Sequence, residues 1–215
     1  MLITCPVALP GQQPVSITTA DSGMVAGLLW GSGNRGVVLV HGGRFDKTSW
    51  SSQAPAIAAA GFRVLAIDLR GTGESIAGAA GPDSLSNDVL AAVRFLRSEG
   101  ATEVQVVGAS LGGWAAAEAS IAAADGEIAG LVLLAAPGID HPERLRVRTL
   151  FVLAEHDTRS SGEVRLDAIR QQYARAGGLK ELVLLGGNAH AQALFNTDQG
   201  PRLLAEILRF LTAAR

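Results

Sequence analysis

Short apolar runs alternate with stretches of helical periodicity along most of the chain. The apolar runs are rich in Val, Ile and Leu and lie at 37–40, 62–68, 104–107, 128–135, 149–154 and 181–185. Runs of this kind and length are typical of strands buried on both faces of a parallel sheet. Helices are expected between and after them, near 50–60, 85–96, 110–119, 163–176 and 198–214. The alternation predicts an α/β fold with a doubly wound, mostly parallel sheet and helices on both faces.

The first part of the chain has a different pattern, which indicates two strands at the edge of the sheet. Residues 15–18 alternate between apolar and polar, residues 21–23 suit a turn, and 24–30 form a second apolar run. Residues 31–36 then read GSGNRG and match the pattern G-x-G-x-x-G of dinucleotide-binding loops. A dinucleotide-binding loop follows a strand and opens a helix, whereas this one leads into a strand. We interpret it as a hairpin loop.

Composition narrows the range of functions. The 215 residues are 48% hydrophobic and 18% charged, without a linker or an internal repeat, and they predict one globular domain over 1–215. The net charge of −2 shows no excess of basic residues of the kind that binds nucleic acid. No apolar stretch approaches the roughly 20 residues of a membrane span, and the start lacks the charged region of a signal peptide. We therefore expect a cytoplasmic monomer or weak homodimer with no nucleic-acid or membrane partner.

The chain has one cysteine, Cys5, which excludes an internal disulfide and a Cys-rich metal site. We interpret it as a packed or exposed residue of an N-terminal strand. The residues that carry chemistry lie elsewhere.

The most informative stretch is 104–117, which reads VQVVGASLGGWAAA. Its β-branched start predicts a buried strand, and strong helix formers follow. Between them, residues 108–112 match G-x-S-x-G, the pattern of a nucleophile elbow with Ser110 at the apex of a strained turn. The two glycines leave room for that turn, because a Cβ atom at either position would crowd it. The N-terminus of the following helix would point amide groups at a developing oxyanion.

An active serine needs a base, and the base needs a carboxylate that orients it. The candidates for the base are four histidines, His41, His141, His156 and His190. In enzymes built on this elbow the serine comes first in the chain, the acid second and the histidine last. His190 lies in the small-residue loop GGNAHA after the last strand, late enough to leave room for an acid. We predict that His190 is the general base.

Asp157 is the predicted carboxylate, because it follows the strand at 149–154 through the sequence EHD. Asp140, after the preceding strand, and Glu155 are the alternatives. An aspartate here could also serve as a helix cap or a turn residue. Asp68 precedes the serine in the chain, which breaks the expected order, and we interpret it as a residue that organises its own loop.

The oxyanion of an acyl-transfer intermediate needs two aimed amide groups. The first is predicted at Leu111, directly after the serine. The second is predicted in the loop HGGR at 41–44, where glycines let the backbone approach a substrate closely. We favour Gly43, with Arg44 as the alternative.

Five motifs in the expected order resemble those of the α/β-hydrolase family. They are the oxyanion loop HGGRFDKTSW, the loop AIDLRGTGES, the elbow GASLGG, the acid strand LFVLAEHD and the histidine loop GGNAH. The resemblance covers nearly all of the chain from Val37 onward. The oxyanion loop and the small size are similar to lidless CCG1-interacting-factor-B-like members, and GASLGGWAAAEA is similar to dienelactone-hydrolase-like members. The resemblance implies an α/β-hydrolase fold without a lid domain and without a metal or cofactor.

The resemblance also implies acyl transfer to water. Ser110 would attack a carbonyl, His190 would take its proton, and Asp157 would fix the imidazole tautomer. Epoxide hydrolases and dehalogenases of this fold resemble the chain less, because they carry aspartate at the elbow. The rival hypotheses are a non-catalytic binding module on the same fold, and a cofactor-free perhydrolase or C–C bond hydrolase.

Between 138 and 148 the chain is too short for the helical lid that many family members carry. We therefore expect a shallow, open pocket for short esters, thioesters or related acyl groups. Its walls are expected to come from Arg44, Phe45, Trp50, Trp114, Leu194 and Phe195. Trp50 and Trp114 would suit the core equally well. We interpret the basic residues Arg144, Arg146 and Arg148 as a solvated loop, with an anionic substrate or partner as the alternative.

Overall fold

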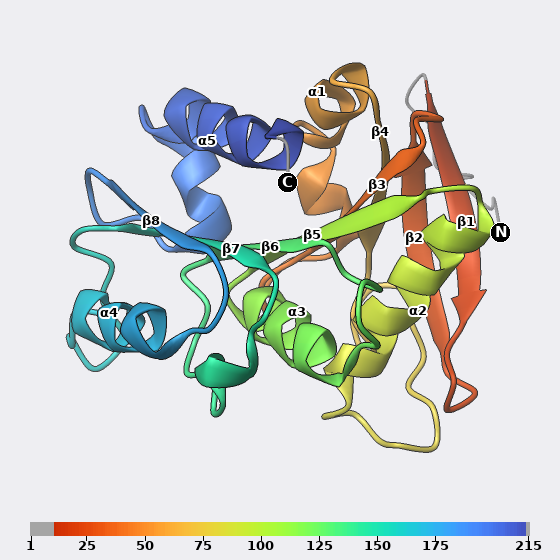
Figure 1. Cartoon of the computed structure of the whole chain (residues 1–215), viewed down its shortest axis with the longest axis horizontal. Coiled ribbons are helices and arrows are strands. Elements are labelled where there is room, and N and C mark those ends of the chain that lie inside the picture. The colour runs from red at the N-terminus through yellow and green to blue at the C-terminus, as the bar shows by residue number, and fades with distance from the viewer. Residues whose placement is uncertain (1–10, 214–215) are drawn as a thin grey trace, which may run out of the picture.

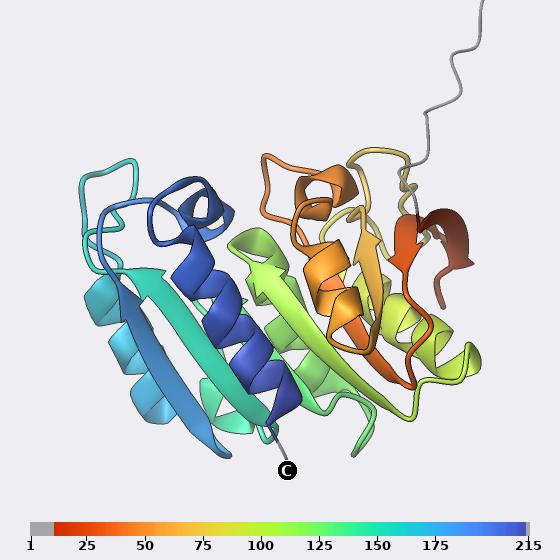
Figure 2. The same cartoon turned by 90° about the horizontal axis from the view of Figure 1, so that it is seen from above.

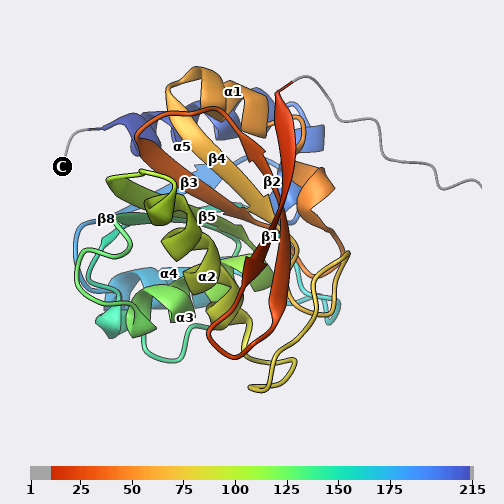
Figure 3. The ribbon, with the colours of Figure 1, turned by 90° about the vertical axis from the view of Figure 1, so that its right-hand side faces the viewer.

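Eight strands form one mixed sheet in the order β1-β2-β4-β3-β5-β6-β7-β8. The computed structural model describes residues 11–213, so that Cys5 lies outside the described residues. The strands are β1 (Gln12–Thr18), β2 (Met24–Trp30), β3 (Arg35–Val40), β4 (Phe62–Ile67), β5 (Glu103–Ala109), β6 (Gly130–Leu134), β7 (Arg148–Ala154) and β8 (Lys180–Leu185). From β4 to β8 all neighbours are parallel. The antiparallel pair β1 and β2 forms the edge that faces the viewer in Figure 3.

Helices cover both faces of this sheet. They are α1 (Ala54–Ala59), α2 (Leu85–Ser98), α3 (Leu111–Ala122), α4 (Leu166–Arg175) and α5 (Gly200–Thr212). In Figure 1, α1 and α5 lie on one face and α2, α3 and α4 on the other. The prediction of an α/β fold with a mostly parallel sheet and two helical layers is therefore confirmed. No helix among the described residues is long and apolar enough to cross a membrane.

Apolar periodicity explains why these elements pack as they do. The predicted stripe of α2 is buried, and its members Leu85, Val89, Ala92, Val93 and Leu96 are each at most 8% exposed. All five residues of β6 are buried. A strand that is apolar at every position suits only a sheet covered on both faces, because one uncovered face would leave every second side chain in water.

The hairpin predicted at 31–36 is wrong. β2 and β3 are not neighbours, because β4 lies between them and pairs with both. The connecting loop instead passes close to the start of β4: a Cβ atom at Gly33 would overlap the carbonyl of Gly61, and Gly31 has a φ of +69°. These glycines therefore serve a close backbone approach and a left-handed conformation. The hairpin predicted between β1 and β2 is confirmed.

Parallel pairing brings the carboxyl ends of β3, β5, β7 and β8 to one edge of the sheet, seen at the top of Figure 2. Four loops meet there, at 41–46, 110, 155–165 and 186–192. Between β6 and β7 the chain forms only one short 3-10 helix, η2 (Pro142–Arg144), and no helical lid. Along the described chain, this connection therefore places no α-helix over the edge where ligands bind in such sheets.

Candidate active site

Ser110 stands at the apex of a sharp turn between β5 and α3. Its φ of +49° and ψ of −118° are rare for a residue with a side chain. A Cβ atom at Gly108 would overlap the carbonyl of Gly112, and one at Gly112 would overlap the carbonyl of His41. The two glycines flanking the serine are thus required by close backbone contacts, as the elbow pattern predicts.

The structure brings Ser110, His190 and Asp157 together in one hydrogen-bonded chain. The Ser110 hydroxyl lies 2.8 Å from Nε2 of His190, and Nδ1 of His190 lies 2.7 Å from Oδ2 of Asp157. An ionised carboxylate only accepts hydrogen bonds, so Nδ1 carries the proton and Nε2 is free to accept one from the serine. This is the tautomer that a base needs.

The acid and the base differ in their exposure. The side chain of Asp157 is fully buried, whereas that of His190 is 36% exposed. A buried acid keeps its orientation, and an exposed imidazole can reach a bound molecule. Within the described chain, neither Asp140 nor Glu155 hydrogen-bonds to His190, and both are exposed.

Asp157 has a second basic neighbour. Nε of Arg165 lies 3.3 Å from Oδ1 of the carboxylate, the oxygen that does not face His190. Neither atom of this pair has a hydrogen bond in the described part of the chain, and both are buried. The contact is therefore an ion pair without hydrogen-bond geometry.

The loop after β3 is held by His41, which is 1% exposed. Its Nδ1 donates to the carbonyl of Gly42 at 2.8 Å, and its Nε2 accepts the amide proton of Leu69 at 3.0 Å. Burial lowers the pKa of His41, although the Gly42 carbonyl acts in the opposite direction. His41 is thus a neutral structural residue, whose role is to fix the loop.

That loop presents two amide groups beside the elbow. The amide of Phe45 donates to the carbonyl of Gly42 at 3.0 Å, which closes a turn with Gly43 and Arg44 at its centre. Among the residues that the structure describes, neither central amide has a hydrogen-bond partner. A Cβ atom at Gly43 would sit 3.5 Å from the side chain of Leu111, so the two predicted oxyanion residues are neighbours.

Gln192 ties this loop to the histidine loop. It follows His190 by two residues, at the start of the 3-10 helix η3 (Ala191–Asn196), and is 5% exposed. Its Oε1 accepts the amide proton of Gly42 at 2.8 Å, and its Nε2 donates to Oγ of Ser49 at 2.9 Å. One side chain thus fixes the distance between the base and the predicted oxyanion loop.

Asp68 organises the neighbouring loop, as the sequence indicates. Its carboxylate accepts from the amide and the ammonium group of Lys47, both at 2.7 Å, and from the amide of Glu74 at 2.9 Å. It lies outside the chain of hydrogen bonds that joins the serine to its base.

The remaining predicted pocket residues separate into two groups. Arg44 and Phe45 are exposed, and Trp114 and Phe195 are partly buried. Trp50 and Leu194 are only 0% and 1% exposed, so Trp50 belongs to the core, the alternative given for it, and the expectation that Leu194 lines an open pocket is wrong. Phe195 packs edge-on against Trp50 with ring centroids 5.8 Å apart. Trp50 and Leu194 therefore pack in the core, a location that the sequence alone does not determine.

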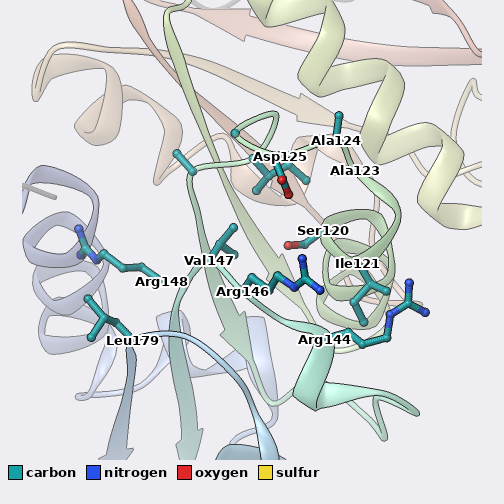
Figure 4. Close-up of a pocket in the computed structure, with 13 residues that line it drawn as sticks. Ser120, Ile121, Ala123, Ala124, Asp125, Arg144, Arg146, Val147, Arg148 and Leu179 are labelled. Atoms are coloured by element: carbon teal, nitrogen blue, oxygen red, sulfur yellow. The ribbon is translucent and has the colours of Figure 1, made fainter.

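A hollow of about 530 Å³ lies at the opposite edge of the sheet (Figure 4). It is lined by the C-terminal end of α3 and by the segment that carries Arg144, Arg146 and Arg148. It shares no residue with the elbow or its partners, so it forms no part of the candidate active site. Within residues 11–213, no group of His, Cys, Asp and Glu side chains is arranged to hold a metal ion.

The sequence alone does not indicate a role for Arg165 or Gln192. Neither belongs to a motif, and their contacts exist only once loops distant in sequence have met. A weak signal for Gln192 is its place two residues after His190, in an otherwise small and apolar stretch.

Comparison with known proteins decides the family. A family model described as the alpha/beta hydrolase family matches residues 37–214. The chain belongs to the alpha/beta hydrolase family. A bifunctional epoxide hydrolase 2 of Sus scrofa is 42% identical over 81 residues, which make up 36% of this chain and 14% of that protein. The chain thus spans about a seventh of that relative.

Solved structures of other hydrolases share the fold of this alpha/beta hydrolase. An esterase of Pyrococcus furiosus has a TM-score of 0.76 at 17% identity, over 93% of this chain and 89% of that one. A predicted CIB-like hydrolase of Thermoplasma acidophilum has a TM-score of 0.75 at 19% identity, over 93% and 97%. A dienelactone hydrolase of Anabaena variabilis has a TM-score of 0.72 at 17% identity, over 94% and 95%. The structural neighbours therefore include both groups that the sequence motifs resemble, the CCG1-interacting-factor-B-like hydrolases and the dienelactone hydrolases.

Proposed function

We propose that this alpha/beta hydrolase is a serine hydrolase that cleaves small esters, thioesters or related acyl substrates through an acyl-enzyme on Ser110. The observation that carries the proposal is the chain of hydrogen bonds from Ser110 through His190 to Asp157, at 2.8 and 2.7 Å. Both distances lie within the range needed for proton transfer between a nucleophile and its base. The esterases among the structural neighbours share the fold at low identity and lend it further support.

In the proposed reaction, Oγ of Ser110 attacks the substrate carbonyl while Nε2 of His190 takes its proton. Asp157 stabilises the imidazolium that forms. The carbonyl oxygen becomes an oxyanion, held by the amides of Leu111 and of Gly43, with Arg44 as the alternative to Gly43. His190 then returns the proton to the leaving group. A water molecule repeats the sequence and releases the acid.

Exposure around the serine supports small substrates. Leu111 is 38% and Phe45 41% exposed, so the walls beside Ser110 are open to solvent. We propose Arg44, Phe45, Trp114 and Phe195 as residues that contact the substrate. An open site removes little apolar surface from water, so extra methylene groups add little to binding. The oligomeric state, the cytoplasmic location and the absence of nucleic-acid and membrane partners stay predictions from composition.

A series of p-nitrophenyl esters from acetate to dodecanoate tests the proposal. We expect kcat/KM to be highest for the short acyl chains and to be lost in Ser110→Ala. Ser120→Ala, on the same helix but at its far end, is the matched control and should keep full activity. Highest activity on dodecanoate would contradict the open-site assignment.

Assays of the same protein with other substrates distinguish ester hydrolysis from the rival reactions, perhydrolysis and C–C bond hydrolysis. Acetate with hydrogen peroxide tests for perhydrolysis, and a dienelactone or a β-diketone tests for the alternative hydrolyses. A folded wild-type protein that turns over none of these substrates would favour the binding module instead.

A further inference from the structure

A small hairpin after β7 returns the chain to the candidate acid. The carbonyl of Asp157 accepts the amide proton of Arg165 at 2.9 Å, and Thr158 and Val164 form an antiparallel bridge beyond it. Arg165 then leads directly into α4. The tip of the hairpin is exposed, but its two ends are closed on each other. The backbone thus fixes the position of the arginine relative to the acid.

The side chains continue this pairing. Asp157 is fully buried, and Arg165 is only 22% exposed. Oδ2 of the carboxylate faces His190, and Oδ1 faces Nε of Arg165 at 3.3 Å. In the described residues, His190 from the loop after β8 and Arg165 from the start of α4 are the titratable or charged side chains in contact with Asp157. His190 is in turn in contact with Ser110.

The charges of these groups give Arg165 a definite role. A buried carboxylate is costly unless a positive charge is paired with it. When His190 is neutral and ready to act as a base, Arg165 is the only cation in contact with Asp157 among the described residues. The arginine therefore supplies this positive charge without a proton on the imidazole.

We propose that Arg165 is a positioning residue of the Ser110–His190–Asp157 site. Its guanidinium group is paired with Oδ1 of the buried carboxylate, whose Oδ2 faces His190, and it supplies the positive charge beside Asp157 when the imidazole carries none. The catalytic part of this proposal rests on the proposed hydrolase function, but the titration of the imidazole does not.

Removal of the charge gives a directional test. In Arg165→Met, a proton on His190 becomes the only positive charge available to the buried carboxylate. The imidazole then protonates more readily, and the acidic limb of the kcat/KM profile moves to higher pH, by about one unit. Arg165→Lys retains the charge but loses the planar guanidinium group, and its limb should stay close to that of the wild type.

The experiment measures kcat/KM for p-nitrophenyl acetate against pH in the wild type and both variants. Arg170→Met is the matched control, because Arg170 lies on the same helix and pairs with Asp167 only at the surface, at 3.9 Å. Its profile should coincide with that of the wild type. An unmoved limb in Arg165→Met, or an equal displacement in Arg165→Lys, would overturn the proposal.

A second readout separates this proposal from the proposed function. The protonation of His190 is followed by NMR of its imidazole in the same folded proteins, without any substrate. We expect the midpoint to rise in Arg165→Met and to return toward the wild-type value in Arg165→Lys. If the wild type hydrolyses no ester but these midpoints shift as expected, the hydrolase assignment fails and the role of Arg165 stands. If the midpoints of all three proteins coincide, the role of Arg165 fails.

Discussion

Oε1 of Gln192 accepts the amide proton of Gly42 at 2.8 Å and so joins the histidine loop to the loop after β3. The two residues are 150 positions apart in the chain. On one side of this bond stands the candidate base His190, and on the other stands Gly43, which adjoins the side chain of Leu111 in the elbow. The bond therefore links the group that moves the proton with the group proposed to hold the oxyanion.

Gln192→Met tests this link. The apolar side chain has a similar length but cannot accept the Gly42 proton, so the oxyanion loop should shift relative to Ser110. We expect kcat to fall about tenfold with little change in KM, because geometry near the reacting atoms affects the transition state most. Steady-state kinetics on p-nitrophenyl acetate provide the measurement.

Gln172→Met is the matched control for that prediction. Gln172 is also buried, and its Oε1 accepts the amide proton of Ile139 at 2.9 Å, whereas in the described residues it has no hydrogen bond to His190, to the elbow or to the loop after β3. Both variants should lose about 1–2 kcal/mol of unfolding free energy in urea, because each leaves a buried amide unpaired. Equal kcat values in the two variants would show that Gln192 has no special relation to the site.

His41 predicts a pH dependence of stability. Burial lowers its folded-state pKa below the ordinary value of 6.5. As the pH falls through about 6.5, the unfolded chain takes up a proton that the folded chain does not, so the unfolding free energy decreases with falling pH. The contribution is fully present above that pH and is lost progressively below it.

The measurement is the unfolding free energy of the wild type and His41→Asn between pH 7.5 and 5. The variant should be less stable at neutral pH, but its stability should fall less steeply as the pH decreases. Parallel curves for His41→Asn and the wild type would contradict the prediction.

Arg70 carries a buried ion pair that anchors the loop after β4. It is 4% exposed and binds the fully buried Asp88 of α2 through Nε and Nη2, at 3.0 and 2.8 Å. Arg70→Met leaves that carboxylate without its cation and should lower the unfolding free energy by about 3–5 kcal/mol. Arg94→Met breaks the surface pair with Glu127 and should lower it by less than about 1 kcal/mol. Similar urea midpoints for the two variants would contradict this difference.

Local chemistry explains what the sequence predicts well. The elbow is specified within 108–112, because close backbone contacts demand glycine on both sides of the serine. The meeting of Ser110, Asp157 and His190 follows from chain order, because parallel strands deliver their carboxyl ends to one edge. These inferences need only the residues near each strand end.

Contacts between distant segments explain what the sequence misses. The pairing of β2 with β4 depends on a strand that comes later in the chain, so the stretch at 31–36 resembles a hairpin. Trp50 and Leu194 have large apolar side chains, which suit a pocket wall as well as the core. Only the three-dimensional packing shows that both are buried in the core. Arg165 reaches the acid through a hairpin that no apolar periodicity marks.

The most direct test of the account is the labelling of the protein by a fluorophosphonate probe, with the modified residue located by mass spectrometry. The probe reacts only with a serine whose hydroxyl is activated by a base. We expect one labelled peptide that carries Ser110, and loss of labelling in Ser110→Ala and in His190→Ala. A folded wild-type protein that stays unlabelled, or a label on another serine, would contradict the assignment of Ser110 as the nucleophile.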